Sequence, residues 1–351
     1  MRRLKQVVCC LGTTIAVSFA VVAQTSGETY TTLDFPDSIN TWAIGVSGNN
    51  IVGCYGGPGS NQGSFLYNSL GYTALSFPDS RSTIATGVSG NNVIGTYQDA
   101  GGTRQVFLYN GSGYTTLDPP GSISAGLKST FVRGVSDNNV VGSYYDAGGT
   151  CHGFLYNGGG YTTLDFPGST STSANAVSGN NIVGSYENAG GIYHGFLYNG
   201  SGYTTLDCPG SMNTWAVGVS GNNIVGSYEN AGGTYHGFLY NGSGYTALAP
   251  PGSTTTEVTG VSGSNVVGLY SDGYTSHGFL YDGSGYTTLD FPGNTSSEAR
   301  GVCGNNVVGD YFDANGTQHG FLYTVPEPST FILLGIGAIG LLAYARRRRA
   351  A

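Results

Sequence analysis

Five histidines stand at one position of a repeated unit, two residues before a phenylalanine, and aligned imidazoles are potential zinc ligands. They are His152, His194, His236, His277 and His319. The position falls on the third strand of each predicted unit, where equivalent residues of neighbouring units should lie on the order of 10 Å apart. Zinc holds its ligand atoms only about 2.1 Å away. We therefore predict structural histidines, bonded to a turn or to the next unit, and no metal site.

A short loop of the unit carries oxygen-bearing residues at alternate positions, as calcium loops do. It is best developed from Asp313 to Thr317, where Asp313 and Asn315 supply one carboxylate and one amide. A tight calcium site takes about six to eight oxygens, and turn chemistry explains the same residues. We predict no cofactor, with calcium as the weaker alternative.

The side chains best suited to bind a ligand gather at one variable position, four residues before a valine of the unit. The seven copies carry Trp42, Ile84, Phe131, Ser173, Trp215, Glu257 and Glu298 there, and two residues further on two copies carry Arg133 and Arg300. An indole can stack on a sugar ring, and arginine binds acidic groups. We predict ligand-binding roles for Trp42, Phe131, Arg133, Trp215 and Arg300. The alternative is that these side chains fill gaps between units.

No nucleophile with a base, phosphate-binding loop or pair of acids stands out, so we predict no catalytic residue. An enzyme of the glycosidase or lyase type is the alternative, and its only candidate residues are Glu257, Glu298, Arg133 and Arg300. The cysteines that follow the N-terminal apolar run occupy four unrelated positions of the unit and read as isolated substitutions, with one chance disulfide left open. They are Cys54, Cys151, Cys208 and Cys303.

The elements that must position these residues come from a unit copied seven times. Its triplet Phe-Leu-Tyr opens at Phe65, Phe107, Phe154, Phe196, Phe238, Phe279 and Phe321. One copy shows four short apolar segments, at 216–220, 224–228, 237–240 and 245–248, separated by Gly- and Asn-rich turns typical of hairpins. Four-stranded antiparallel units repeated in this way close into a ring. We predict an all-β, seven-bladed β-propeller, with a β-solenoid as the alternative.

The order of the segments supports closure of the ring. Tyr30 to Phe35 is a fourth strand with no preceding strands, and Phe321 to Tyr323 is a third strand with no fourth after it. We expect the N-terminal strand to complete the last blade.

Changes of length fall at one end of the predicted ring. Five extra residues lie between Asp118 and Val135, in a connection from a fourth strand to the next first strand, and one residue is missing before His277, in a loop from a second to a third strand. Antiparallel pairing places both kinds of loop at the same end, and recognition usually resides on such loops.

The net charge is −8, but between residues 26 and 325 five basic residues face nineteen acidic ones, which gives 5 − 19 = −14 for this body. Such a surface repels phosphate backbones, so we exclude nucleic acid as a partner.

Both ends of the chain contain sorting information. Residues 1–23 have the basic start, apolar run and small-residue site of a signal peptide, with a retained anchor as the alternative. Residues 24–325 form the repeat domain, and residues 326–351 add a transmembrane helix at 330–345 and an arginine cluster at 346–349. A plain tail anchor would show the same run and charges.

With its motif Pro326-Glu327-Pro328, this ending resembles the PEP-CTERM sorting signal. The resemblance implies recognition by an exosortase and at least transient membrane attachment through the helix. It also implies export to the surface or extracellular matrix of a Gram-negative bacterium, in a setting linked to exopolysaccharide or biofilm.

The repeated wording His-Gly-Phe-Leu-Tyr also resembles the HAF-type extracellular repeat, named for its His-Ala-Phe core, although Gly replaces Ala in five copies. That resemblance implies an exported bacterial protein and no particular activity. Together these features predict a non-enzymatic surface or matrix module that binds polysaccharide or another envelope component. A structural coat protein without a soluble ligand is a further alternative.

Overall fold

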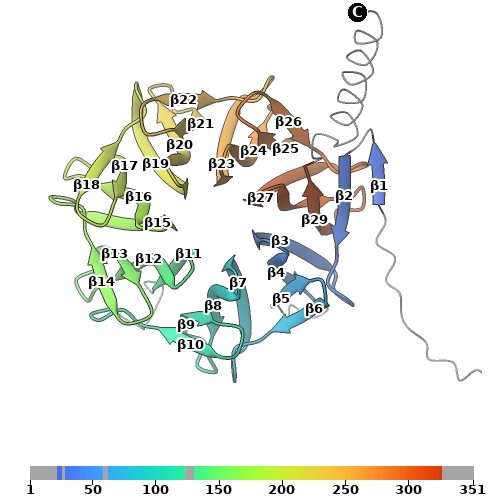
Figure 1. The fold of residues 1–351 in the computed structure, drawn as a ribbon, viewed down its shortest axis with the longest axis horizontal. Helices are drawn as coiled ribbons and strands as arrows, with labels where there is room; N and C mark the ends of the chain where they lie inside the picture. The colour runs from blue at the N-terminus through green and yellow to red at the C-terminus, as the bar shows by residue number, and fades with distance from the viewer. Residues whose placement is uncertain (1–21, 26–27, 58–61, 123–129, 326–351) are drawn as a thin grey trace, which may run out of the picture.

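Seven antiparallel sheets are arranged in a ring in the computed structural model, which describes residues 22–25, 28–57, 62–122 and 130–325 (Figure 1). Residues 1–21 of the predicted signal peptide and the predicted helix at 330–345 lie outside the described residues. No helix within the described part of the chain is long and apolar enough to span a membrane. The predicted seven-bladed propeller with four-stranded blades is confirmed.

Six blades run outward from the centre in chain order, and the last blade takes its outer strand from the N-terminus. The innermost strands are β3 (Asn40–Ser47), β7 (Ser82–Ser89), β11 (Phe131–Ser136), β15 (Ser171–Ser178), β19 (Ser211–Ser220), β23 (Thr255–Ser262) and β27 (Ser296–Cys303). The second strands are β4 (Asn50–Gly56), β8 (Asn92–Gln98), β12 (Asn139–Tyr145), β16 (Asn181–Glu187), β20 (Asn223–Asn230), β24 (Asn265–Ser271) and β28 (Asn306–Phe312). The third strands are β5 (Gln62–Asn68), β9 (Arg104–Tyr109), β13 (Cys151–Tyr156), β17 (Tyr193–Tyr198), β21 (Tyr235–Tyr240), β25 (Ser276–Tyr281) and β29 (Gln318–Thr324). The outer strands are β6 (Gly71–Leu75), β10 (Tyr114–Leu117), β14 (Tyr161–Leu164), β18 (Tyr203–Leu206), β22 (Tyr245–Leu248), β26 (Tyr286–Leu289) and, in the last blade, β2 (Glu28–Leu33).

The N-terminal strand closes the ring as expected. Strand β2 pairs antiparallel with β29, with Tyr30 opposite Tyr323. Tyr30 is only 2 % exposed, and its ring centroid lies 5.5 Å from that of Phe291 in an edge contact. Strand β1 (Val22–Thr25), which the sequence did not predict, pairs with the outer edge of β2 and makes this sheet five-stranded.

The core lies between neighbouring blades and is filled by the most constant residues of the unit. The phenylalanine of every Phe-Leu-Tyr triplet is fully buried, at 0 % exposure. A glycine of the second strand makes room for it: a Cβ on Gly184 would come within 2.0 Å of the carbonyl oxygen of Ser173 and 2.8 Å of the Phe196 ring. Here β15 also carries a bulge, between Ala174 and Ala176. Constancy of these residues therefore reflects packing.

A belt of asparagine side chains links the hairpins of successive blades. Each donates from its amide nitrogen to the backbone oxygen of the next hairpin turn, and the last bond, from Asn306 to Gly48 at 3.1 Å, closes the belt. The other donors are Asn50, Asn92, Asn139, Asn181, Asn223 and Asn265. The turn glycines make this geometry accessible, as at Gly179, whose φ of 59° is left-handed.

In several blades, a buried threonine near the start of the innermost strand forms a hydrogen bond with the backbone of the loop that precedes the strand. In β7, Thr83 accepts a hydrogen bond from the backbone N–H of Phe77 at 2.9 Å. In β23, the residue that corresponds to Phe77 is Pro250, which has no N–H to donate. Within the described residues, the hydroxyl oxygen of Thr256 is accordingly buried without a hydrogen-bond partner.

Candidate functional site

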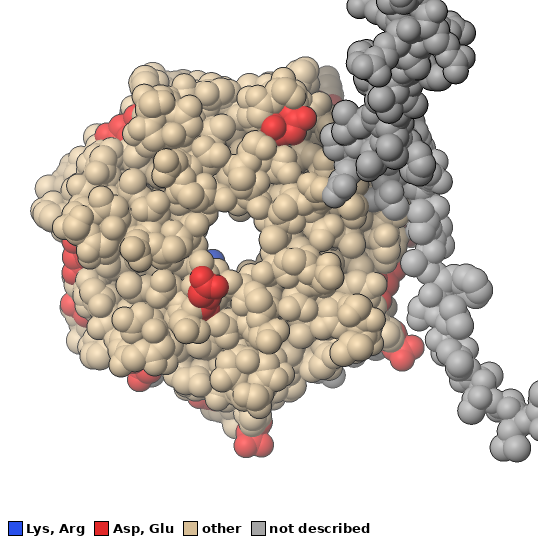
Figure 2. All heavy atoms as spheres, viewed as in Figure 1, with Lys and Arg blue, Asp and Glu red and all other residues tan. Residues whose placement is uncertain are grey.

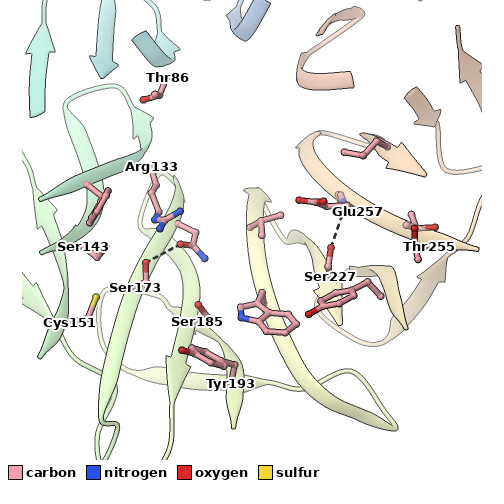
Figure 3. Close-up of a pocket in the computed structure, with 18 of the residues that line it drawn as sticks. Thr86, Arg133, Ser143, Cys151, Ser173, Ser185, Tyr193, Ser227, Thr255 and Glu257 are labelled. Atoms are coloured by element: carbon pink, nitrogen blue, oxygen red, sulfur yellow. Dashed lines mark hydrogen bonds between the residues drawn. The ribbon is translucent and has the colours of Figure 1, made fainter. Parts of the chain in front are cut away.

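A pocket of about 1170 Å³ opens on one side of the ring, mainly across four adjacent blades, and Thr86 on β7 of a fifth blade also lines it (Figure 3). Its wall is formed by the innermost strands β11, β15, β19 and β23, the second strands beside them, and the first residue of each third strand. The register places the start of each innermost strand beside the end of the second strand, as Ser171 beside Glu187, and that end beside the start of the third strand. The pocket therefore lies at the end of the ring that carries the loops of variable length. We call this end the variable face.

Small side chains in one blade create the hollow. In β15 and β16, the residues that line it are Ser171, Ser173, Asn175 and Ser185, three of them serines. Large residues occupy the position of Ser173 in the neighbouring blades, Phe131 in β11 and Trp215 in β19. Ser173, between these two aromatic residues, leaves space that no neighbour fills, and this is the origin of the pocket.

Three aromatic side chains form a strip along the wall. The ring centroid of Trp215 lies 5.9 Å from that of Tyr193 and 5.8 Å from that of Tyr235, with interplanar angles of 32° and 26°. Tyr193 and Tyr235 are 37 % and 45 % exposed, so the strip retains accessible ring surface. At these spacings no ligand fits between the rings, and a flat ligand would instead lie across their exposed parts.

One positive and one negative side chain line the pocket. Arg133 on β11 and Glu257 on β23 are both exposed and lie on opposite sides in Figure 3. They are the only basic and the only acidic residue among the described residues that line it.

Some polar side chains of the pocket wall form hydrogen bonds within the protein. Ser173 donates to the amide oxygen of Asn175 at 3.2 Å, and the Asn175 amide nitrogen donates to the Ala216 carbonyl at 2.9 Å, across to the next blade. The Ser227 hydroxyl accepts from the backbone N–H of Val258 at 3.4 Å. The bonds of Asn175 to Ala216 and of Ser227 to Val258 join neighbouring blades beside the aromatic strip.

The structure divides the predicted ligand-binding residues into two groups. Phe131, Arg133 and Trp215 line the pocket, whereas Trp42 and Arg300 do not. Trp42 lies on β3, and its ring would contact a Cβ placed on Gly56 of its own blade at 3.8 Å. Arg300 is bound within its own blade to Glu298, at 2.8 Å, and to the buried carboxylate of Asp310.

Tyr193 and Tyr235 were missed by the sequence reasoning. They precede the aligned histidines, at a position that reads Gln62, Arg104, Cys151, Tyr193, Tyr235, Ser276 and Gln318 in the seven copies. The variability of this position was visible in the sequence. What the unit did not reveal is that the position lies beside the innermost strand of the next blade, so that Tyr193 of β17 reaches Trp215 of β19.

The aligned histidines bond within their own blades and not to the next unit. In four blades the Nδ1 atom lies within 3.0 Å of the aspartate that follows the outer strand, as in the pair His194 and Asp207. Its Nε2 accepts from the Asn188 amide in the loop between the second and third strands, at 2.9 Å. The described residues contain no group of three or more His, Cys, Asp or Glu placed to hold a metal ion.

His152 has two acidic neighbours. Its Nδ1 lies 2.9 Å from Asp165 and its Nε2 3.4 Å from Asp146. Burial alone would lower the pKa of His152, but the hydrogen bonds and charges of Asp165 and Asp146 outweigh it and raise the pKa above its ordinary value.

The loop considered for calcium is a turn closed by its own carboxylate. Asp313 accepts from the backbone N–H groups of Asn315 and Thr317, each at 2.8 Å. These bonds, that of Thr317 first, lower the pKa of Asp313. The calcium alternative remains an untested prediction.

The cysteines that the structure describes are free thiols. Cys151 lines the pocket, and burial is the largest effect that raises its pKa. Since the thiolate is the nucleophilic form, this environment does not prepare Cys151 for nucleophilic chemistry.

The surface agrees with the acidic balance of the sequence. In Figure 2 acidic side chains are scattered around the rim, with one group beside the open centre, and almost no basic surface is visible on this face.

The C-terminal residues match a family model. Residues 324–349 match the PEP-CTERM protein-sorting motif. The chain ends in a sorting signal. This motif implies sorting by an exosortase-type enzyme and export to the cell envelope or surface. Comparison with curated proteins finds no match.

Solved structures share the fold at low sequence identity. The β-propeller domain of the Trilobed protease from Pyrococcus furiosus, described as having an open velcro topology, is 9 % identical, with a TM-score of 0.60 over 82 % of this chain and 95 % of that one. The acylaminoacyl peptidase of Pyrococcus horikoshii gives 9 % identity and a TM-score of 0.55 over 86 % of this chain and 55 % of that one. A puromycin-hydrolyzing peptidase of Mycobacterium tuberculosis gives 12 % and 0.54, over 81 % and 53 %. The chain spans about half the length of these two peptidases, and the likeness shows the fold alone.

Proposed function

We propose that this chain is an exported saccharide-binding module of the cell surface or extracellular matrix. The aromatic strip of Tyr193, Trp215 and Tyr235 carries the proposal. Sugar rings present apolar C–H faces that stack on aromatic rings, and their hydroxyls bond to polar groups such as those of Ser185 and Thr255 beside the strip. The sorting motif supports a setting in which exopolysaccharide is available, in a Gram-negative envelope.

The proposal also covers the type of repeat and the question of whether binding requires an ion. We retain the HAF-type resemblance as support for an extracellular role. We propose that saccharide binding needs no cofactor, and a measurement with and without calcium tests this.

A carbohydrate-active enzyme is less well supported. Most glycoside hydrolases use two carboxylates that flank the scissile bond. Glu257 is the single carboxylate among the described residues of the pocket wall, and Glu298, the other acidic candidate, is paired with Arg300.

The repeat supplies a matched pair of variants for the test. Trp215 and Trp42 occupy the same position of the unit, but only Trp215 lines the pocket. A glycan array first selects a bound saccharide, and titration calorimetry then compares Trp215→Ala with Trp42→Ala. We expect Trp215→Ala to weaken binding at least about tenfold, as at the aromatic centre of an interface, and Trp42→Ala to leave it unchanged.

Thermal unfolding of both variants separates folding from binding. Equal losses of affinity in the two variants would contradict the pocket as the site. Release of reducing sugar or unsaturated product from the bound saccharide would favour the enzyme.

A further inference from the structure

The charges of the pocket wall suggest what kind of saccharide it takes. Within the described residues, neither Arg133 nor Glu257 forms an ion pair, and both side chains are exposed. Exposed charges keep their hydration, so they lie in the open pocket without the cost of burial and remain available to a ligand.

The closing blade shows what the same residue types do when they meet. Glu298 and Arg300 occupy the positions of Glu257 and Arg133 in the unit, but both are on β27. There Arg300 lies 2.8 Å from Glu298 and also binds Asp310, so the positive charge is neutralised. In the pocket, two blades separate β11 from β23, and each charge is left without its counterpart.

The aromatic strip lies between the two charges along the ring. Tyr193 belongs to the blade that begins with β15, and Trp215 and Tyr235 belong to the blade that begins with β19. Arg133 stands in the blade before them and Glu257 in the blade after them. The wall thus presents, in order, a cation, a stacking surface and an anion.

Complementarity then defines the ligand. We propose that the bound saccharide carries charges of both signs: a carboxylate, as in a uronic acid, held by Arg133, and a protonated amine, as in an unsubstituted amino sugar, held by Glu257. Guanidinium binds carboxylate through two parallel hydrogen bonds, and carboxylate accepts from ammonium. The body charge of −14 between residues 26 and 325 disfavours a purely acidic polymer, which the second charge of the ligand relieves. This inference rests on the saccharide-binding role proposed above.

Oligosaccharides of hyaluronan test the proposal, because chemical N-deacetylation adds free amines while the carboxylates stay. The full-length chain, in detergent, is titrated with the N-acetylated, the N-deacetylated and the N-deacetylated, carboxyl-reduced forms, and with a neutral β-glucan. We expect the mixed-charge form to bind about 10- to 100-fold more tightly than each of the others, the range for a charged hydrogen-bonded contact.

Variants assign each charge. Arg133→Met should remove the advantage conferred by the carboxylate and Glu257→Gln the advantage conferred by the amine, each without effect on the other. Arg81→Met serves as the control, since Arg81 is exposed but does not line the pocket.

The possible failures are distinguishable. If all four saccharides bind equally and Trp215→Ala abolishes binding, the saccharide-binding role stands and the mixed-charge inference is wrong. If the mixed-charge form is preferred but Arg81→Met reduces that preference as much as Arg133→Met, the inference is also wrong. If none of the four binds although the glycan array yields a ligand, only the mixed-charge inference is wrong, and if the array yields no ligand either, both proposals fail.

Discussion

Replacing Thr256 by Val should stabilise the protein, although the residue is buried. Thr256 is 1 % exposed, and its hydroxyl oxygen has no partner within the described residues because Pro250 stands where other blades offer a backbone N–H. Leaving a buried polar group unpaired costs about 1–3 kcal/mol, and valine has nearly the same shape as threonine. We expect Thr256→Val to raise the free energy of unfolding by about 1 kcal/mol.

The same substitution in another blade supplies the control. Thr83 is 2 % exposed and bonds to the Phe77 N–H at 2.9 Å and the Ser80 hydroxyl at 3.0 Å. Thr83→Val leaves the partly buried backbone N–H of Phe77 without its acceptor, and we expect a loss of about 1–3 kcal/mol. Urea unfolding followed by tyrosine and tryptophan fluorescence measures both. A loss at Thr256 equal to that at Thr83 would refute the reasoning, because it would mean that the Thr256 hydroxyl has a partner.

Three further predictions concern the stability of the folded propeller. Gly184→Ala should lower the free energy of unfolding by about 3 kcal/mol or more, because its Cβ would lie 2.0 Å from the Ser173 oxygen. Gly202→Ala is the control and should change this free energy by less than about 1 kcal/mol, since no atom lies within 4 Å of its Cβ. Similar unfolding midpoints for the two variants would contradict the packing argument. Tyr30→Ala should lower the free energy of unfolding by about 3–5 kcal/mol, because it removes the buried side chain of β2, the strand that closes the ring. Faster proteolysis of the N-terminal segment is a second readout. An unchanged unfolding midpoint would mean that closure of the ring does not depend on β2. The pKa of His152 is raised in the folded protein, so its contribution to stability is fully present below the ordinary pKa of 6.5 and is lost as the pH rises through the raised value. His152→Gln should therefore lower the free energy of unfolding more at about pH 5 than at about pH 8. An equal loss at both pH values would show that protonation of His152 is not involved.

The fold was predictable because the same local signals recur in every copy. Seven copies repeat one turn chemistry and one apolar pattern, so a weak signal in one unit is confirmed by the others, and Tyr30 to Phe35 could be assigned to the last blade by order alone. Strand β1 could not be predicted this way, since it lies outside the repeat and adds a fifth strand at the edge of β2.

The candidate site was predictable only in part, because the sequence of the repeated unit does not show which residues of adjacent blades contact one another. Phe131, Trp215 and Trp42 occupy the same position of the unit, yet they differ in the residues that the adjacent blades place beside them. Trp215 meets Tyr193 of the preceding blade, and Arg300 meets Glu298 and Asp310 of its own. A single sequence gives the identity of each residue but not whether a neighbouring small residue, such as Ser173, leaves space beside it.

In this ring, the residues that stabilise the fold and the residues of the candidate binding site lie in different places. Residues that cannot vary, such as the buried phenylalanines and Gly184, lie between blades, where a change of shape is costly. Several residues that line the variable face, such as Arg133, Glu257 and Tyr235, are exposed, so substitutions there alter the wall without changing the packing between blades. Seven equal blades would form a symmetric funnel, and the pocket opens where Ser173 stands at a position that carries Phe131 and Trp215 in the neighbouring blades. Filling that blade, for example by Ser173→Trp, should therefore abolish ligand binding while the ring stays closed.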